Sequence, residues 1–122
     1  MNSKRLAIAA KTASDEKKGI DPVILDIREL TDIADFFVLV NGTSDRHACT
    51  IAEAILERLY QKKVKPLHVE GKSEARWILI DYGSVIVHVF HYETRKFYSL
   101  ERLWGDAKIV KQKDEKQTKR TR

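Results

Sequence analysis

Two neighbouring runs of alternating residues constrain the fold of this chain more than any other feature. Residues 77–82 are WILIDY and residues 85–91 are VIVHVFH, with a glycine directly after the first run. β-Branched and aromatic residues in such runs, separated by a tight turn, are typical of a β-hairpin. We therefore predict two adjacent antiparallel strands, joined by a two-residue loop at Tyr82-Gly83.

This loop sets the predicted register and separates the hairpin into two faces. The predicted cross-strand pairs are Asp81–Ser84, Leu79–Ile86 and Trp77–His88. One face is entirely aliphatic and is expected to be buried; it carries Ile78, Ile80, Val85, Val87 and Val89. The other face mixes aromatic, aliphatic, acidic and imidazole side chains; it carries Trp77, Leu79, Asp81, Ile86, His88 and Phe90. A three-residue loop would exchange the two faces.

The mixed face is typical of a protein interaction site rather than of a solvated surface. The alternative is that a helix covers this face as well, which would make it a second core with a polar pair inside it. His88 presents the same choice, because it could be a surface contact residue or a hydrogen-bonded core histidine. We adopt the docking interpretation, with His88 at the surface.

Hydrophobic periodicity in the rest of the chain predicts a single α/β domain. Apolar residues from Leu6 to Ala13 predict a first helix, with Gly19 as its stop. Helix-capping residues at 43–45 precede a second apolar stripe, which consists of Ala48, Ile51, Ala52, Ile55 and Leu59. Further strands are predicted at residues 23–27, 36–40 and 66–70. The predicted order is α-β-β-α-β-β-β with a short closing helix near residues 100–104, which gives a mixed sheet flanked by helices.

The length and composition fit one soluble domain. The chain has 122 residues, of which 43% are hydrophobic, enough for one core and too few for two ordinary domains. No apolar run approaches the roughly 18 residues of a membrane span, and residues 1–19 carry dispersed charges instead of the apolar segment of a signal peptide. We therefore expect a cytoplasmic protein that makes no membrane contact.

Positive charge is concentrated at the C-terminal end. From residue 108 onward the chain has seven basic and two acidic residues, which account for the whole net charge of +5. We therefore divide the chain into a domain at residues 1–107 and a basic tail at residues 108–122, which is expected to be disordered. The tail is interpreted either as a loose, salt-sensitive contact with rRNA or as a solubilising terminus. The rRNA contact would use Lys111, Lys113, Lys116, Lys119, Arg120 and Arg122.

Residues with catalytic or metal-binding potential are sparse. The four histidines include no pair at helical i, i+4 spacing, so we expect neither a metal nor another cofactor. Residues 42–45, GTSD, could cradle a phosphate at a strand-to-helix junction, but a helix cap explains them more simply. The rival to a binding protein is a nucleotidyltransferase-like enzyme that uses Ser44 with Asp26 or Asp45. It lacks the closely spaced carboxylates that would hold its metal, so we predict no enzymatic activity.

Four blocks of sequence, taken together, carry a family resemblance. They are residues 26–37 (DIRELTDIADFF), 42–47 (GTSDRH), 66–71 (PLHVEG) and 77–83 (WILIDYG), the last continued by 87–90 (VHVF) and 100–104 (LERLW). In this order they resemble the ribosomal silencing factor family, whose members are also called Iojap-like proteins. The resemblance spans about residues 21–105, which makes it more specific than any single motif.

The resemblance implies a translation repressor rather than an enzyme. Members of this family bind the large ribosomal subunit through its protein number fourteen, at the surface that meets the small subunit. They thereby hinder subunit joining and lower translation when nutrients are short. The family has an α/β fold related to nucleotidyltransferases, and dimers occur among its members.

Carried over by position, the family's contact surface includes the strand from Trp77 to Tyr82 and the neighbouring strand with His88 and Phe90. We expect Trp77 to anchor the partner and Leu79 and Ile86 to extend the apolar contact. Asp81, Tyr82 and His88 are expected to fix its orientation. The free protein could use the same face to form a homodimer. The alternatives to a translation repressor are a nucleotidyltransferase-like enzyme and a general RNA-binding protein that acts through the basic tail.

Overall fold

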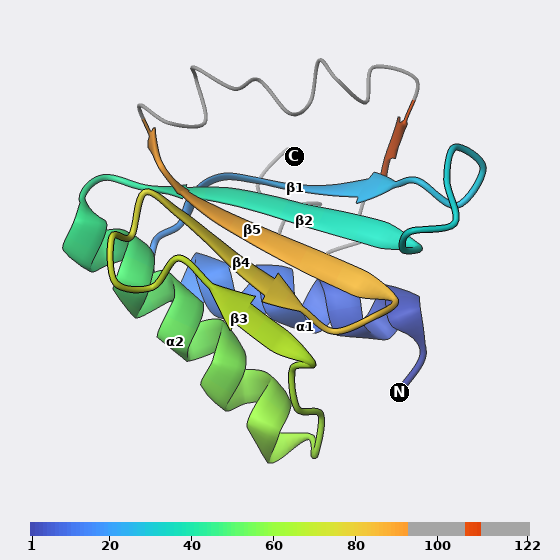
Figure 1. Cartoon of the computed structure of the whole chain (residues 1–122), viewed down its shortest axis with the longest axis horizontal. Coiled ribbons are helices and arrows are strands. Elements are labelled where there is room, and N and C mark those ends of the chain that lie inside the picture. Colours follow the sequence, from blue (N-terminus) through green and yellow to red (C-terminus); the bar gives the residue numbers. More distant parts are fainter. Residues whose placement is uncertain (93–106, 111–122) are drawn as a thin grey trace, which may run out of the picture.

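The described residues form one α/β domain in which two helices cover one face of a six-stranded sheet (Figure 1). The computed structural model describes residues 1–92 and 107–110. Its elements are α1 (Ser3–Glu16), β1 (Ile20–Asp26), β2 (Phe36–Gly42), α2 (Asp45–Gln61), β3 (His68–Glu70), β4 (Trp77–Asp81), β5 (Val85–His91) and β6 (Lys108–Ile109). The strands lie in the order β3-β4-β5-β2-β1-β6. Only the central β2–β5 pair among them is parallel, so the predicted mixed α/β sheet is confirmed.

Both helices form where capping residues and apolar stripes predicted them. The Ser44 hydroxyl accepts a hydrogen bond from the backbone N–H of His47 at 3.0 Å, which caps α2. All five residues of the predicted stripe on this helix are fully buried against the sheet. The first helix ends at Glu16, before the predicted stop at Gly19, because Lys18 takes the left-handed conformation with φ 61°.

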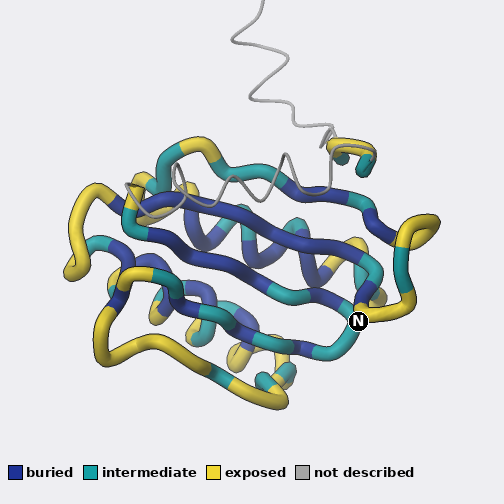
Figure 2. The backbone as a smooth tube through the Cα atoms, turned by 45° about the horizontal axis from the view of Figure 1, so that its top comes forward, coloured by how far each residue is buried: buried dark blue, intermediate teal, exposed yellow. Residues whose placement is uncertain are grey.

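The apolar side chains form two clusters, one on each face of the sheet. The larger cluster lies between the sheet and the helices and includes every residue of the predicted aliphatic hairpin face. The smaller cluster lies on the opposite face, away from α1 and α2, and consists of Leu25, Ile27, Ala34, Phe37, Leu39 and Phe90. Figure 2 shows that burial is concentrated in the central strands and that exposed residues lie mainly in the connecting loops.

The predicted hairpin register is wrong by two residues. The observed pairs include Trp77 with Phe90 and Leu79 with His88. The loop consists of Gly83 and Ser84 instead of Tyr82 and Gly83, because Gly83 has a φ of +88° and occupies the first loop position. A shift of two residues leaves every side chain on its predicted face, so the separation of the two faces is confirmed.

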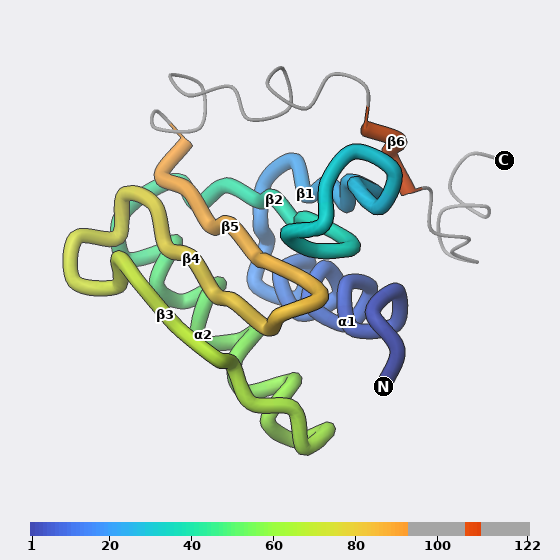
Figure 3. Tube along the Cα trace, turned by 45° about the vertical axis from the view of Figure 1, so that its right-hand side comes forward, coloured from blue at the N-terminus to red at the C-terminus, as the bar shows by residue number. Residues whose placement is uncertain are grey.

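A short strand follows the segment that the structure leaves undescribed. Lys108 and Ile109 pair with Asp26 and Leu25 as β6, at the sheet edge next to β1 (Figure 3). The backbone N–H of Val110 also donates to the Ile24 carbonyl at 2.8 Å. The start of the predicted tail therefore belongs to the sheet, whereas the predicted closing helix and residues 111–122 lie outside the described part of the chain. None of the described helices is long and apolar enough to cross a membrane.

Candidate functional site

The hairpin face away from α1 and α2 carries a partly exposed strip of mixed chemistry. Side chains alternate along β4 and β5, so one set faces the helices and the other set faces away. Four residues of the second set are partly exposed, and we refer to them as the β4–β5 strip: Trp77, Leu79, Asp81 and Ile86. The strip therefore offers an aromatic ring, two aliphatic side chains and a carboxylate on one side of the domain.

Two predicted site residues lie on the same face but below its surface. His88 is 5% exposed and Phe90 is fully buried, so the expectation of a surface imidazole at position 88 is wrong. The Phe90 ring lies 5.1 Å from the Trp77 ring and is nearly parallel to the His88 ring, with centroids 6.1 Å apart. Phe37 on β2 meets the His88 ring edge-on at 4.8 Å. These aromatic rings support the indole from below.

A hydrogen bond links the buried His88 ring to Trp77 of the β4–β5 strip. The indole N–H of Trp77 donates to Nδ1 of His88 at 3.1 Å. Burial lowers the pKa of His88 to about 4, so the imidazole is neutral at physiological pH. Its Nε2 is buried and has no hydrogen-bond partner among the residues that the structure describes.

Tyr82 lies on the opposite side of the sheet from the strip. Even-numbered residues of β4 face the helices, and Tyr82 continues this series beyond the last residue of the strand. It is 8% exposed, and burial raises the pKa of its hydroxyl to about 12. The predicted role of Tyr82 in orienting a partner therefore does not fit its position, because its side chain belongs to the helix-covered core.

The two turns at the ends of β4 fix the strip in place. At one end, the Asp81 carboxylate accepts a hydrogen bond from the backbone N–H of Gly83 at 2.7 Å, which orients this side chain. At the other end, Gly71 has a φ of +85°, and a Cβ atom there would overlap the carbonyl oxygen of Trp77. The tight approach of the two backbones at Gly71 positions the start of β4.

The strip has neighbours that sequence reasoning did not include. His68 and Glu70 on the edge strand β3 pair with Asp81 and Leu79, so all four side chains share one face. The His68 ring lies 2.6 Å from the Glu70 carboxylate, and both residues are exposed. His68 and Glu70 flank Val69 in the predicted strand, and this alternation could have placed both side chains on one face. Leu67, which is 74% exposed, adds apolar surface beside the hairpin turn.

Ser44 and Asp26, one of the two residue pairs of the rival enzyme, lie far apart. Asp26 pairs with Phe36 at the start of β2, whereas residues 42–45 follow its far end. Asp26 is also held by two hydrogen bonds from the Arg28 guanidinium, at 2.9 and 2.7 Å, which lower the pKa of its carboxyl group. Ser44 and Asp26 therefore lie at opposite ends of a strand pair, and the interpretation of Ser44 as a helix cap is confirmed.

In residues 42–45, the alternative phosphate cradle, a histidine side chain already accepts a hydrogen bond from one of the backbone N–H groups. The backbone N–H of Thr43 donates to Nδ1 of His47 at 2.9 Å. Since Nδ1 accepts this hydrogen bond, Nε2 carries the ring hydrogen and donates to the Lys17 carbonyl at 2.8 Å. This histidine thus ties the start of α2 to the end of α1.

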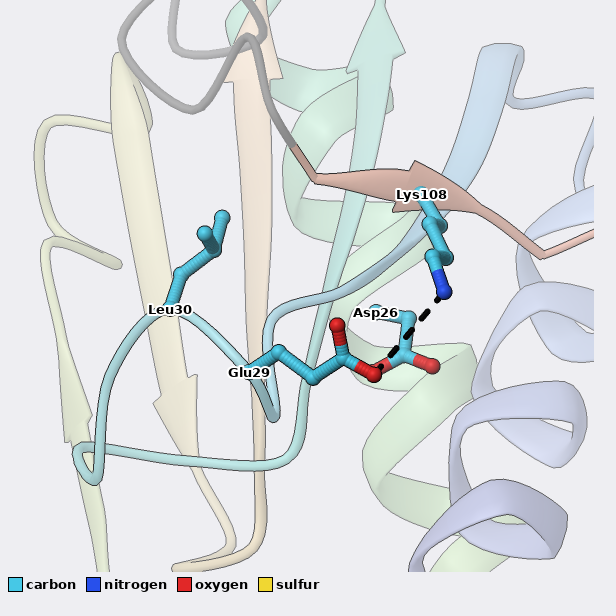
Figure 4. Close-up of a pocket in the computed structure, with 4 residues that line it drawn as sticks. All are labelled: Asp26, Glu29, Leu30 and Lys108. Atoms are coloured by element: carbon cyan, nitrogen blue, oxygen red, sulfur yellow. Dashed lines mark ion pairs between the residues drawn. The ribbon is translucent and has the colours of Figure 1, made fainter.

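A small pocket lies at the end of β1, away from the strip (Figure 4). It is lined by Asp26, Glu29, Leu30 and Lys108, and its volume of about 30 Å³ has room for about one water molecule. Lys108 of β6 lies 3.8 Å from the Glu29 carboxylate. Within residues 1–92 and 107–110, no three histidine, cysteine or acidic side chains are grouped so that they could hold a metal ion.

Comparison with known proteins shows relatives of the same length and fold. The chain matches the family "Ribosomal silencing factor during starvation" over residues 1–122. It is 39% identical over 110 residues to "Ribosomal silencing factor RsfS" of Bacillus subtilis, an alignment that covers 90% of this chain and 93% of the relative.

Two crystal structures are also similar. One, of a Chromobacterium violaceum protein, has 30% identity and a TM-score of 0.84, covering 86% of this chain and 88% of that protein. The other, from Bacillus halodurans, has 34% identity and a TM-score of 0.80, covering 90% of this chain and all of that protein. The match over the whole chain, together with these relatives, shows that the chain belongs to the ribosomal silencing factor family.

Proposed function

We propose that this protein represses translation by binding the large ribosomal subunit through its protein number fourteen and occupying space that the small subunit needs. Family membership implies regulation of translation at the ribosome, and a regulatory role rather than an enzymatic one. The observation that carries the finer proposal is the partly exposed β4–β5 strip on the sheet face away from α1 and α2. The proposed site of action is the cytoplasm, where ribosomal subunits join.

The strip has the composition of an interaction hot spot. Trp77 would bury its ring in the ribosomal protein, and Leu79 and Ile86 would extend the apolar contact. Asp81, whose carboxylate is already oriented by the Gly83 N–H, would fix the register of the two partners. Because aromatic rings already pack against the indole, little side-chain freedom remains to be lost on binding.

The proposed mechanism is steric and requires no reaction. The sheet face would dock on the large subunit, and the helix layer on the opposite side would then project toward the incoming small subunit. An apolar contact of this kind should be only weakly sensitive to salt, in contrast to a complex held by basic side chains.

Sedimentation through sucrose gradients tests this proposal. The full-length protein is mixed with isolated large subunits, isolated small subunits and joined ribosomes, at low and at moderate salt. We expect co-migration with large subunits alone at both salt concentrations, together with fewer joined particles when both subunits are present. Equal binding to every RNA-containing particle, lost at moderate salt, would overturn the proposal in favour of binding through the basic tail.

We also propose that the free protein forms a homodimer through the same strip. A second copy would cover the apolar side chains that a ribosome-bound protein buries against its partner. Analytical ultracentrifugation should then show a dimer that weakens in the Trp77→Ala protein. A dimer of unchanged affinity in this variant would assign the contact to another surface.

The remaining basic tail is proposed to add a weak contact with rRNA. Because Lys108 to Val110 belong to the sheet, the informative truncation removes residues 111–122 only. We expect the truncated protein to keep its salt-resistant binding to large subunits and to lose affinity mainly at low salt. Unchanged binding at both salt concentrations would leave the tail as a solubilising terminus.

A further inference from the structure

We infer that His88 is a positioning residue, which holds the Trp77 indole in the orientation needed for docking and does not itself touch the partner. The inference rests on the proposed function, because it concerns the same strip. It assigns a role to a buried imidazole that the packing of the domain alone does not explain.

The hydrogen bond between the two residues determines the state of the imidazole. An indole N–H can only donate, so the nitrogen that it meets at 3.1 Å, Nδ1 of His88, must be an unprotonated acceptor. The imidazole hydrogen is therefore on Nε2. Burial favours this neutral form of the ring, in agreement with the geometry.

The acceptor is held rigidly. The His88 side chain lies on the central strand β5, between Leu79 on β4 and Leu39 on β2. Phe37 contacts the ring edge-on, and the Phe90 ring is inclined to it by only 7°. An imidazole packed in this way presents Nδ1 in one direction, toward the indole.

Burial of the His88 imidazole has a free-energy cost, and this cost indicates which interaction the imidazole provides. Nε2 of His88 is a buried donor without a partner among the described residues. A phenylalanine at this position would occupy similar space without burying an unpaired polar group. The feature that an apolar ring could not reproduce is the hydrogen bond to Trp77, so we assign the imidazole to that bond.

The exposure of the two residues separates their roles. Trp77 is partly exposed, whereas His88 is 5% exposed. A partner that docks on the strip would meet Trp77, Leu79 and Ile86 before it could reach the imidazole. His88 therefore acts through Trp77.

Two substitutions with opposite effects on stability test the inference. His88→Phe keeps a ring but removes the acceptor, whereas His88→Asn keeps an oxygen near the position of Nδ1 but leaves a cavity. We expect the His88→Phe protein to be at least as stable as the wild type and to bind large subunits about tenfold more weakly. The His88→Asn protein should be less stable, yet its affinity should stay within about threefold of the wild type. A merely structural role predicts that affinity follows stability, which is the reverse order.

The indole N–H resonance provides a direct readout of the hydrogen bond. The chain has two tryptophans, so the Trp77 resonance is assigned with a Trp104→Phe protein. In the His88→Phe protein we expect this resonance to shift and its exchange with solvent to become faster. An unchanged resonance and exchange rate would overturn the inference, whatever the affinities are.

A double-mutant cycle tests whether substitutions at position 88 affect binding through Trp77 or in another way. Trp77→Phe keeps an aromatic ring but has no N–H to donate. In this background His88→Phe should change the affinity by less than about twofold, because the bond is already absent. A full tenfold loss there would show that His88 acts without Trp77 and would overturn the inference.

The outcomes also distinguish the inference from the proposed function. If the wild-type protein fails to bind large subunits, the proposed function fails and the docking role of His88 fails with it. If the wild type binds and a folded His88→Phe protein binds equally well, only the inference is overturned.

Discussion

The two faces of the β4–β5 hairpin are built from the same strands but have opposite character. On the helix-covered face, the five aliphatic hairpin residues are fully buried and belong to one chemical class. On the face away from α1 and α2, exposure is graded, from fully buried Phe90 to the partly exposed strip, and the chemistry is mixed. The comparison shows how a single pair of strands can serve stability with one set of side chains and recognition with the other, because alternate residues point to opposite sides.

The largest expected effect tests the stability role of the helix-covered face. Ile80→Ala removes a fully buried side chain under the helices and should lower the free energy of unfolding by about 2 to 5 kcal/mol. Urea unfolding measures this loss. The fraction that remains folded should bind large subunits with unchanged affinity. Reduced affinity of that folded fraction would show that the two faces are not independent.

The next effect tests the recognition role of the face away from α1 and α2. Trp77→Ala should weaken binding to large subunits by about 2 to 4 kcal/mol while the domain stays folded. Tyr60→Ala is a matched control, because Tyr60 is an aromatic residue on α2 that is 62% exposed, and its removal should leave binding unchanged. Equal dissociation constants for the folded Trp77→Ala protein and the wild type would exclude Trp77 as the anchor.

A smaller effect is expected in the pH dependence of stability, to which His88 contributes. The pKa of His88 is about 4 in the folded protein and ordinarily 6.5, so between these values the unfolded chain binds more protons than the folded one. Stability should therefore fall as the pH is lowered from about 6.5 to about 4, by up to about 1.4 kcal/mol per pH unit. Urea unfolding of wild type and His88→Phe at several pH values isolates this contribution, which the phenylalanine variant should lack. Parallel pH profiles would contradict the assignment of a depressed pKa to His88.

The smallest effect concerns a region that belongs to neither face. Ser44→Ala removes the N-cap of α2 and should cost about 1 kcal/mol of stability without changing ribosome binding. Calorimetry with a magnesium–nucleoside triphosphate complex provides the contrasting test, and we expect no heat of binding in either protein. Metal-dependent binding that disappears in the Ser44→Ala protein would revive the enzyme alternative.

Part of the candidate site could be predicted from the sequence because it depends on strand alternation alone. Trp77, Leu79, Asp81 and Ile86 share a face in any register that differs from the true one by an even number of residues. The predicted loop at Tyr82-Gly83 was wrong, and these four residues still share a face only because the register error was two residues. Tyr82 was misplaced because of the same error. It was assigned to the loop, and a loop residue is not assigned to either face of the sheet.

Other features were not accessible, because they depend on which distant segments meet. The burial of His88 follows from its position on a central strand beside β2, whose Leu39 pairs with it across about fifty residues of chain. The pairing of Lys108 and Ile109 with the end of β1 likewise has no local signal in a basic, polar segment.

The sequence by itself determined the order of helices and strands from α1 to β5, the aliphatic and mixed faces of the hairpin, and the family resemblance, because all three depend on local periodicity and short motifs. Only the tertiary structure decided that both helices cover the same face, that β2 lies beside β5, and that His88 supports Trp77 from within the sheet. These features depend on contacts between residues far apart in the chain, and the free energy of such contacts is determined by packing in three dimensions rather than by any local pattern.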